Sequence, residues 1–320
     1  MNTVLYVVVP CYNEEEVLGE TSARLKEKLR SLMSAGKISE ESKIMFVNDG
    51  SKDKTWQLIS KFHEEDKIFS GVNLSRNRGH QTALLAGLNT AAKFADAIVS
   101  MDADLQDDIN AVDEMLEKFE GGAEIVYGVR KSRKKDSFFK RFTAEAFYKI
   151  IDKMGGEVVF NHADYRLMSN RAVKALGEYK EANLFLRGLV PMIGFKSELV
   201  FYERAKRFAG ESKYPLKKML AFAYEGITSL TVTPIKMVRR AGVAFTILGL
   251  LGLAATITLF CLGIAAQGWI TIAAVVTMAG VLQFSLGIIG DYVGKTYMEA
   301  KHRPRYFISE VLNDAETRDE

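Results

Sequence analysis

The chain has 320 residues, of which 26% are charged, and its formal net charge is only +3. This length is enough for one large α/β domain and a further part, and the near-balanced charge gives no reason to expect a nucleic-acid partner. The two cysteines, Cys11 and Cys261, lie far apart in the sequence. This spacing favours reduced thiols and a cytosolic main domain over a domain stabilised by a disulfide. The N-terminus enters an apolar run directly, so no secretory signal is expected.

The first part of the chain alternates between apolar runs and helix-like stretches. The expected strands are Leu5–Val9, Lys43–Val47, Phe69–Leu74, Ala97–Met101 and Ile125–Tyr127, and the expected helices are Val17–Met33, Thr55–Phe62, Thr82–Phe94 and Ala111–Phe119. Strands that alternate with helices predict an α/β fold whose mostly parallel sheet is covered on both faces.

Each expected strand is followed by a polar cluster. In chain order these clusters are Cys11–Glu14, Asn48–Ser51, Ser75–Arg78, Asp102–Asp104 and Gly128–Arg130. Ligands of such sheets bind beyond the carboxyl ends of the strands. The five loops are therefore expected to form the rim of one ligand site. The sequence contains neither GxGxxG after the first strand nor GxxxxGK[ST]. A metal ion is therefore expected to supply much of the positive charge that a bound phosphate needs.

Two carboxylates, Asp102 and Asp104, stand one residue apart at the end of the fourth expected strand. Acids after a strand often cap a helix or face solvent, and a DxD pattern alone is weakly specific. Here a buried-type strand, Ala97–Met101, precedes the pair, and Gln106 and Asp107 follow it. This context favours a site for a hard divalent cation that carries a phosphate.

Residues in two further loops of this rim keep two interpretations each. Asp49 either starts an Asx turn with the two residues after it, or accepts a hydrogen bond from a base or ribose. Tyr12 and Glu14 either belong to a loop that feeds a helix N-terminus, where acids are favoured, or contact a nucleotide. Because Pro10 fixes the turn after the first strand, it suits an aromatic side chain that stacks on a nucleobase.

Basic stretches and single polar residues are also ambiguous. Arg130 and Arg141 belong to one basic run and Arg204 to another, which are either solvated surfaces or contacts to anionic lipid headgroups or a lipid phosphate. Asp164 stands two residues before Arg166, so it is either half of a local ion pair or a catalytic base. The histidines His80 and His162 show no metal-ligand spacing, and we expect structural roles for them.

Two uncharged runs, Ala241–Ala266 and Ile270–Gly290, exceed the roughly 20 residues that a helix needs to cross a bilayer. Basic residues flank their outer ends, which predicts cytoplasmic termini, and Lys213–Val238 predicts helices along the membrane surface. Small residues in both runs predict close helix packing within a homo-oligomer, for which a tetramer is one option. The expected parts are a cytoplasmic domain at 1–212, interfacial helices at 213–240, a transmembrane hairpin at 241–293 and a cytoplasmic tail at 294–320.

The motifs PxYNE, NDGS, SRNxGH, DADLQ, GxR and DYRL, in this order and with the two-helix tail, resemble those of the polyisoprenyl-phosphate glycosyltransferases. These inverting family-2 enzymes have a GT-A fold and include dolichol-phosphate mannose synthase and bacterial undecaprenyl-phosphate glucosyltransferases. The resemblance covers essentially the whole chain. It implies a GT-A nucleotide-sugar-binding domain followed by interfacial helices and a transmembrane hairpin, in a multi-pass protein of the bacterial plasma membrane with a cytoplasmic catalytic domain.

The resemblance also implies roles for individual residues. Pro10, Tyr12, Glu14 and Asp49 would line the uracil and ribose pocket, and Asp102 and Asp104 would hold Mg²⁺ or Mn²⁺ and, with Ala103 and Gln106, the donor diphosphate. Arg130 and Arg141, helped by Arg204, would bind the lipid phosphate and the leaving group, and Asp164 would lie near the sugar as the candidate base. Arg130 and Asp164 are the expected catalytic residues.

The implied reaction transfers a sugar from a nucleotide sugar, with UDP-glucose or UDP-N-acetylglucosamine favoured, to undecaprenyl phosphate in the membrane. Inversion gives a β-linked lipid phosphosugar for glycosylation of the cell envelope. The lipid phosphate is already an anion at neutral pH, so positioning and charge neutralisation matter more than a strong base.

Three other functions are less well supported. A processive polysaccharide synthase would carry a QxxRW segment, and neither Trp56 nor Trp269 lies in one. A non-catalytic membrane scaffold with a relic nucleotide site is disfavoured by the intact Asp49, Asp102 and Asp104. A nucleotidyltransferase would need a glycine-rich loop for a triphosphate.

Overall fold

The structure is a computed structural model that describes residues 3–131, 162–181, 184–203 and 268–317, together with single positions between 224 and 262. The chain divides into two compact units. One consists of Met1–Ala223 and Pro304–Glu320, and the other of Tyr224–Arg303.

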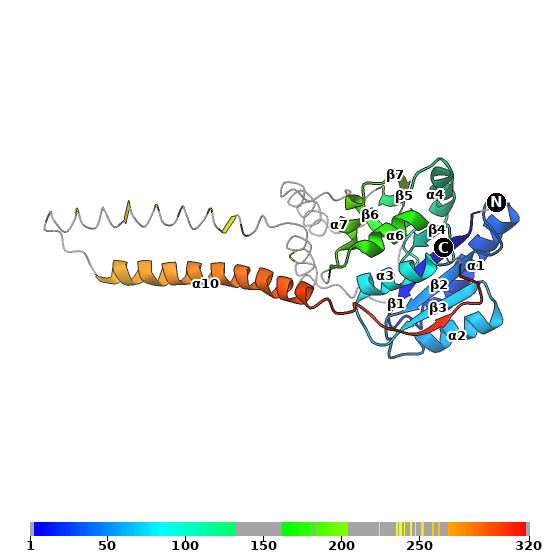
Figure 1. The fold of residues 1–320 in the computed structure, drawn as a ribbon, viewed down its shortest axis with the longest axis horizontal. Helices are drawn as coiled ribbons and strands as arrows, with labels where there is room; N and C mark the ends of the chain where they lie inside the picture. The colour runs from blue at the N-terminus through cyan, green and yellow to red at the C-terminus, as the bar shows by residue number, and fades with distance from the viewer. Residues whose placement is uncertain are drawn as a thin grey trace. The chain divides into compact units, whose positions relative to one another are not determined.

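The first unit is built on a mixed sheet with the strand order β7-β5-β6-β4-β1-β2-β3-β8 (Figure 1). The strands are β1 (Leu5–Cys11), β2 (Lys43–Asn48), β3 (Phe69–Leu74), β4 (Ala97–Ser100), β5 (Ile125–Arg130), β6 (His162–Ser169), β7 (Ser197–Tyr202) and β8 (Ile308–Leu312). The pairs β1–β2, β1–β4, β2–β3 and β5–β7 are parallel, whereas β6 is antiparallel to β4 and β5, and β8 is antiparallel to β3. The predicted α/β fold with a mostly parallel sheet is confirmed.

Helices cover both faces of this sheet (Figure 1). On one face lie α1 (Leu18–Ser34), α2 (Thr55–Glu65) and α4 (Ala111–Glu120), and on the other lie α3 (His80–Ala91), α6 (Asn170–Glu178) and α7 (Leu186–Met192). The second unit contains α10 (Gly268–Ala300).

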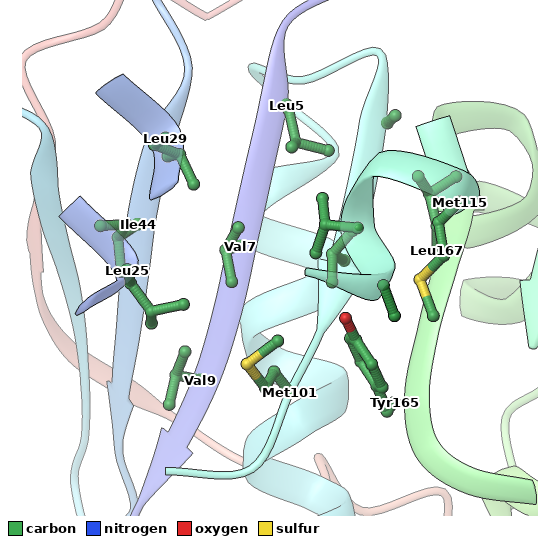
Figure 2. Packing of buried hydrophobic residues seen from close by; sticks show 14 of the residues in the cluster. Leu5, Val7, Val9, Leu25, Leu29, Ile44, Met101, Met115, Tyr165 and Leu167 are labelled. Atoms are coloured by element: carbon green, nitrogen blue, oxygen red, sulfur yellow. The ribbon is translucent and has the colours of Figure 1, made fainter. Parts of the chain in front are cut away.

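The strands divide their side chains between two buried layers because successive residues point to opposite faces of a sheet. Leu5, Val7 and Val9 of β1 join the layer of α1, whereas Tyr6 and Val8 join the layer of α3. Figure 2 shows the first layer, in which Leu25 and Leu29 of α1 lie close to the side chains of β1 and β2. Burial on both faces explains why these strands read as continuous apolar runs rather than as alternating ones.

The five strands and four helices expected in the first part of the chain are all present, with boundaries shifted by a few residues. Beyond the five expected strands the sheet contains β6, for which the apolar pattern gave no bounds. This strand contains the DYRL motif and enters the sheet between β4 and β5. Its place depends on pairing with strands far away in the sequence, and a short run such as Tyr165–Met168 does not encode that pairing.

The predicted membrane hairpin is wrong. Among the residues that the structure describes, no helix is both long enough and apolar enough to span a bilayer. A crossing needs about 20 consecutive, mainly apolar residues in one helix. The hairpin at 241–293, and with it the prediction of a multi-pass protein of the plasma membrane, is therefore corrected. Most of the first expected span, Ala241–Ala266, and most of the expected interfacial segment, Lys213–Val238, lie outside the described residues.

Candidate active site

The predicted rim forms where the carboxyl ends of β1, β2 and β3 come together. The parallel register places Cys11 beside Asn48 and Asn48 beside Asn73, so the loops that follow begin at the same level. The Asn48 Nδ2 donates to Asn73 Oδ1 at 2.8 Å, and the Asn48 Oδ1 accepts from the Ser51 backbone N–H at 3.2 Å. The turn after β2 is therefore held by Asn48.

The loop after β1 is tied to the loop after β2. The backbone N–H of Asn13 donates to Ser51 Oγ at 3.0 Å, and that of Glu14 donates to Thr55 Oγ1 at 3.0 Å. Within this fixed loop Tyr12 stays 38% exposed, as an aromatic that stacks on a ligand must. Pro10 is different, because it is buried inside β1 and pairs with Val47 rather than standing in the loop.

Asp49 is almost fully buried and holds the next loop in place. Its Oδ1 accepts from the Arg78 N–H at 2.7 Å and its Oδ2 from the Gly79 N–H at 2.9 Å. Burial raises the pKa of Asp49, and these two hydrogen bonds oppose the shift. Gly50 allows the close approach because it has a φ of +60°, and a Cβ there would lie 2.5 Å from the backbone of Arg76. The loop that Asp49 fixes leads directly into α3.

His80 is the first residue of α3, and it lies between two of the predicted site acids. Its Nε2 is 3.6 Å from Asp102 Oδ1 and 3.8 Å from Asp164 Oδ2. The structural role expected for His80 did not anticipate this position. Its place in the SRNxGH motif was the available signal, since the other members of that motif belong to a rim loop.

Asp102 and Asp104 follow β4, as expected. The Thr21 hydroxyl of α1 donates to the Ala103 carbonyl at 2.8 Å, and Asp104 Oδ1 accepts from the Gln106 N–H at 3.2 Å. Burial raises the pKa of Asp102; His80 opposes that shift, whereas Asp164 and Asp104 add to it. Burial is the main cause of the raised pKa, and the two neighbouring carboxylates increase it.

The donor set fits a divalent ion only if the substrate completes the coordination. No group of three or more His, Cys, Asp or Glu side chains suited to a metal ion occurs among the described residues. Mg²⁺ is commonly held by one or two carboxylates together with phosphate oxygens and water. Asp102 and Asp104 provide such a pair, whereas a site made by protein ligands alone is not present in the described part.

Asp164 stands on β6 in a cluster of guanidinium groups. Arg166 Nη2 donates to its Oδ1 at 3.0 Å, and Arg187 of α7 donates from Nε to Oδ1 at 3.2 Å and from Nη2 to Oδ2 at 3.0 Å. Burial by itself raises the pKa of Asp164, but the charges of Arg187 and Arg166 overcome this effect and hold the pKa well below its usual range. The local ion pair with Arg166 is confirmed.

Arg130 ends β5 and is the described member of the predicted phosphate-binding arginines. Its Nε donates to the Tyr202 hydroxyl at 3.3 Å, and its Nη2 lies 3.5 Å from Asp107 Oδ1. Its charge acts on Asp102 and is itself influenced by Arg187, so it belongs to the same electrostatic neighbourhood. Arg141 and Arg204 lie outside the described residues.

Sequence reasoning missed Arg187 and Tyr202 as neighbours of the site, and it noted Asp107 after the Asp102–Asp104 pair without giving it a role. Arg187 lies in a mainly apolar stretch, and Tyr202 ends an edge strand more than 70 residues after Arg130. Neither position carries a local signal. Asp107 directly follows the DADLQ motif, which was the one available indication of its place.

Comparison with known proteins agrees with the motifs. The model of "Glycosyl transferase family 2" matches residues 6–177. The chain is 50% identical over 307 residues to the "uncharacterized glycosyltransferase YkoT" of Bacillus subtilis (strain 168), covering 95% of this chain and 91% of that protein. It is 35% identical over 310 residues to a "prophage bactoprenol glucosyl transferase homolog" of Escherichia coli (strain K12), covering 95% and 98% of the two chains. It is 34% identical over 305 residues to the "bactoprenol glucosyl transferase" of Shigella phage SfV, covering 94% and 97%.

Among solved structures, glucosyl-3-phosphoglycerate synthase from Mycobacterium tuberculosis is similar with a TM-score of 0.46 and 16% identity, covering 71% of this chain and 79% of that chain. Likeness at this level supports no inference about function.

Proposed function

The chain belongs to glycosyl transferase family 2, and from this membership we propose that it transfers glucose from UDP-glucose to undecaprenyl phosphate. UDP-N-acetylglucosamine is the alternative donor. The relatives named as bactoprenol glucosyl transferases align over at least 94% of this chain, which supports a polyprenyl phosphate as the acceptor and glucose as the first sugar to test.

One observation carries the proposal at the level of the site. Carboxylates that suit a metal-bound diphosphate, Asp102 and Asp104, share a rim with the guanidinium groups of Arg130 and Arg187. A transfer between a nucleotide diphosphate and a lipid monophosphate brings two anions together, so it needs such paired positive and metal-binding groups. Tyr12, Glu14 and Asp49 are proposed to lie along the base and ribose, with Pro10 supporting their loop from within the sheet.

A divalent cation, Mg²⁺ or Mn²⁺, would neutralise the diphosphate as it leaves. Asp102 and Asp104 would hold it, and Gln106 and Ala103 would contact the same end of the donor. The protein residues then have two tasks: to align the lipid phosphate with the anomeric carbon, and to offset the repulsion between the two substrates. In-line attack from the opposite face inverts the anomeric centre and yields a β-linked product.

Asp164 is proposed to act as a fixed counter-ion rather than as a base. Two arginines occupy both of its oxygens and keep its pKa well below the usual range, so it accepts a proton poorly. The acceptor phosphate is ionised at neutral pH and does not need a base. Asp164 therefore serves to orient Arg187 and Arg166.

The proposal is tested with the purified full-length chain and undecaprenyl phosphate in detergent. UDP-glucose, UDP-N-acetylglucosamine and GDP-mannose are offered separately, and the lipid product is identified by mass spectrometry. We expect one new lipid phosphohexose from UDP-glucose. A product only from UDP-N-acetylglucosamine would change the sugar and keep the reaction class. Polymer formation would favour a processive synthase, and nucleotide binding without transfer to the lipid would overturn the acceptor.

A further inference from the structure

We propose that Asp107 and Tyr202 form a positioning pair that fixes the guanidinium group of Arg130 for the acceptor phosphate. This inference rests on the function proposed above and adds two residues to its site. Neither residue needs to touch a substrate, because both act through Arg130.

Strand register brings the pair together. β5 and β7 are parallel neighbours, and Arg130 and Tyr202, the last residues of these strands, are directly opposite each other. Opposite residues on adjacent strands point to the same face of a sheet. The loop after β4 supplies Asp107, so three separate elements meet at the carboxyl end of the sheet.

The hydrogen bonds run in one direction through this group. Arg130 Nε donates to the Tyr202 hydroxyl oxygen at 3.3 Å, and the Tyr202 hydroxyl donates to Asp107 Oδ1 at 2.5 Å. Arg130 Nη2 also points to Asp107 Oδ1 at 3.5 Å. The Nε edge of the guanidinium group is thus held by the protein, and this restricts the rotation that a long side chain would otherwise keep.

The burial of Asp107 favours a functional reason for this arrangement. Its side chain is 1% exposed, and its Oδ2 has no hydrogen-bond partner among the described residues. A buried carboxylate with an unpartnered oxygen costs stability, and apolar residues of similar size often stabilise a fold better. Burial and the nearby charge of Asp102 raise the pKa of Asp107 to about 6. This shift agrees with the free-energy cost of keeping the carboxylate ionised at this place.

Aromatic packing holds Tyr202 in place from another side. The ring of Tyr165 meets that of Tyr202 edge-on, with centroids 5.3 Å apart and an interplanar angle of 81°. This contact is between the two rings, and the Tyr165 hydroxyl donates elsewhere, to the Asp108 carbonyl at 2.9 Å. The Tyr202 ring is therefore constrained, and its hydroxyl has a defined direction toward Arg130.

The test is a double-mutant cycle in the full-length chain with UDP-glucose and undecaprenyl phosphate. We expect Tyr202→Phe and Asp107→Asn each to lower kcat/KM for the acceptor about tenfold, as for one lost charge-assisted hydrogen bond. The KM for UDP-glucose should stay within about twofold, because Arg130 is assigned here to the acceptor phosphate rather than to the donor. Arg130→Ala should lose more, and adding Tyr202→Phe to it should cost nothing further, since a positioning residue has no task once Arg130 is gone.

Matched controls are available in the same neighbourhood. Tyr165→Phe removes a buried tyrosine hydroxyl that does not contact Arg130, and Asp108→Asn neutralises the next acid in the sequence. Both should keep acceptor kinetics near those of the wild type. Thermal unfolding of every variant shows whether it folds, and Tyr202→Phe is the variant least disturbing to packing.

The affinity of the same variants for farnesyl phosphate, a short polyprenyl monophosphate, is also measured by calorimetry. Additive losses from Tyr202→Phe and Arg130→Ala would indicate a merely structural role and overturn the inference while the proposed reaction stands. If the wild type transfers no sugar but binds farnesyl phosphate with non-additive losses, the reaction fails and the positioning pair survives. Absence of both transfer and binding would overturn both.

Discussion

At the scale of single residues, the site is organised by charges that neutralise one another in pairs. Asp164 is held by Arg166 and Arg187, whereas Asp102 lies among carboxylates, and the charges of Asp164 and Asp104 add to the burial that raises its pKa. Two neighbouring carboxylates repel each other, and a bound cation relieves that repulsion. This contrast separates the acids proposed for metal binding from the acid proposed as a counter-ion.

Asp104→Asn tests the metal-binding proposal, because it keeps the shape of the side chain and removes its charge. We expect turnover to fall at least about a hundredfold, similar to the loss of one group that stabilises transition-state charge. Chelation with EDTA should abolish wild-type turnover, and Mg²⁺ or Mn²⁺ should restore it. Asp108→Asn is the matched control and should behave as wild type. Undiminished turnover in EDTA would remove the metal from the mechanism.

The arginines around Asp164 predict a specific pH dependence. Its pKa in the folded chain is lowered, so its contribution to stability is present above the unfolded value of about 3.9 and is lost as the pH falls further. Asp164→Asn should therefore lower the free energy of unfolding at pH 7 by about 3–5 kcal/mol, because it leaves Arg166 buried without its counter-ion. Urea denaturation at pH 7 and pH 3 should show that the difference shrinks in acid.

The pH dependence of turnover tests whether Asp164 acts as a base. Between pH 5 and 8, titration of Asp164 should cause no fall in kcat, because Asp164 stays ionised throughout that range. An acidic limb in the wild type that disappears in Asp164→Asn would restore Asp164 to the role of base.

At the scale of elements, α3 joins a site residue to the packing of the sheet. It begins at His80, and its Gly87 lies directly against β1 and β2, where a Cβ would be 2.5 Å from Val8 Cγ1 and Val47 Cγ2. Both neighbours are fully buried valines with little freedom to move. The helix is thus close to the strands because this position has no side chain.

Gly87→Ala should force α3 away from the sheet and lower the free energy of unfolding by about 1–3 kcal/mol, as overpacking does. Because His80 moves with the helix, turnover should fall as well. Gly19→Ala is the matched control, since a Cβ at Gly19 in α1 would meet nothing within 4 Å. That change should leave stability unchanged or raise it by up to about 1 kcal/mol. Equal effects of the two substitutions, measured by thermal and urea unfolding, would contradict the packing argument.

At the scale of the whole molecule, the chain leaves the first unit after Ala223 and returns to it at Pro304. The returning segment forms β8, which pairs with β3, and Tyr306 accepts a hydrogen bond from Asn89 Nδ2 at 3.1 Å. Asp314 makes an ion pair with Lys67 at 2.9 Å. The segment Ile308–Leu312, far along the chain from the other strands, therefore belongs to the sheet on which the site is built. Homo-oligomerisation stays a prediction.

Truncation after Arg303 should destabilise the first unit and expose the edge of β3. An unpaired strand edge pairs readily with other chains, so we expect aggregation on size-exclusion chromatography and a lower midpoint of thermal unfolding. Truncation after Thr317 removes three residues beyond β8 and serves as the control. A monodisperse and equally stable protein without residues 304–320 would show that β8 is dispensable.

The sequence by itself determined the elements of the first part of the chain and the rim of its site. Buried strands such as Leu5–Cys11 are apolar without interruption, and the polar residues that follow them mark their carboxyl ends, because both properties are local. For the same reason the sequence alone indicates Asp49, Asp102, Asp104 and Arg130 as candidate site residues. The family could be identified because it depends on the order of such motifs.

Only the tertiary structure decided which of these groups act on one another. The contacts of Asp164 with Arg187 and of Arg130 with Tyr202 join strands and helices that are 23 and 72 positions apart in the sequence. Strand order, antiparallel insertion of β6 and the return of β8 arise from long-range pairing, which no local pattern encodes.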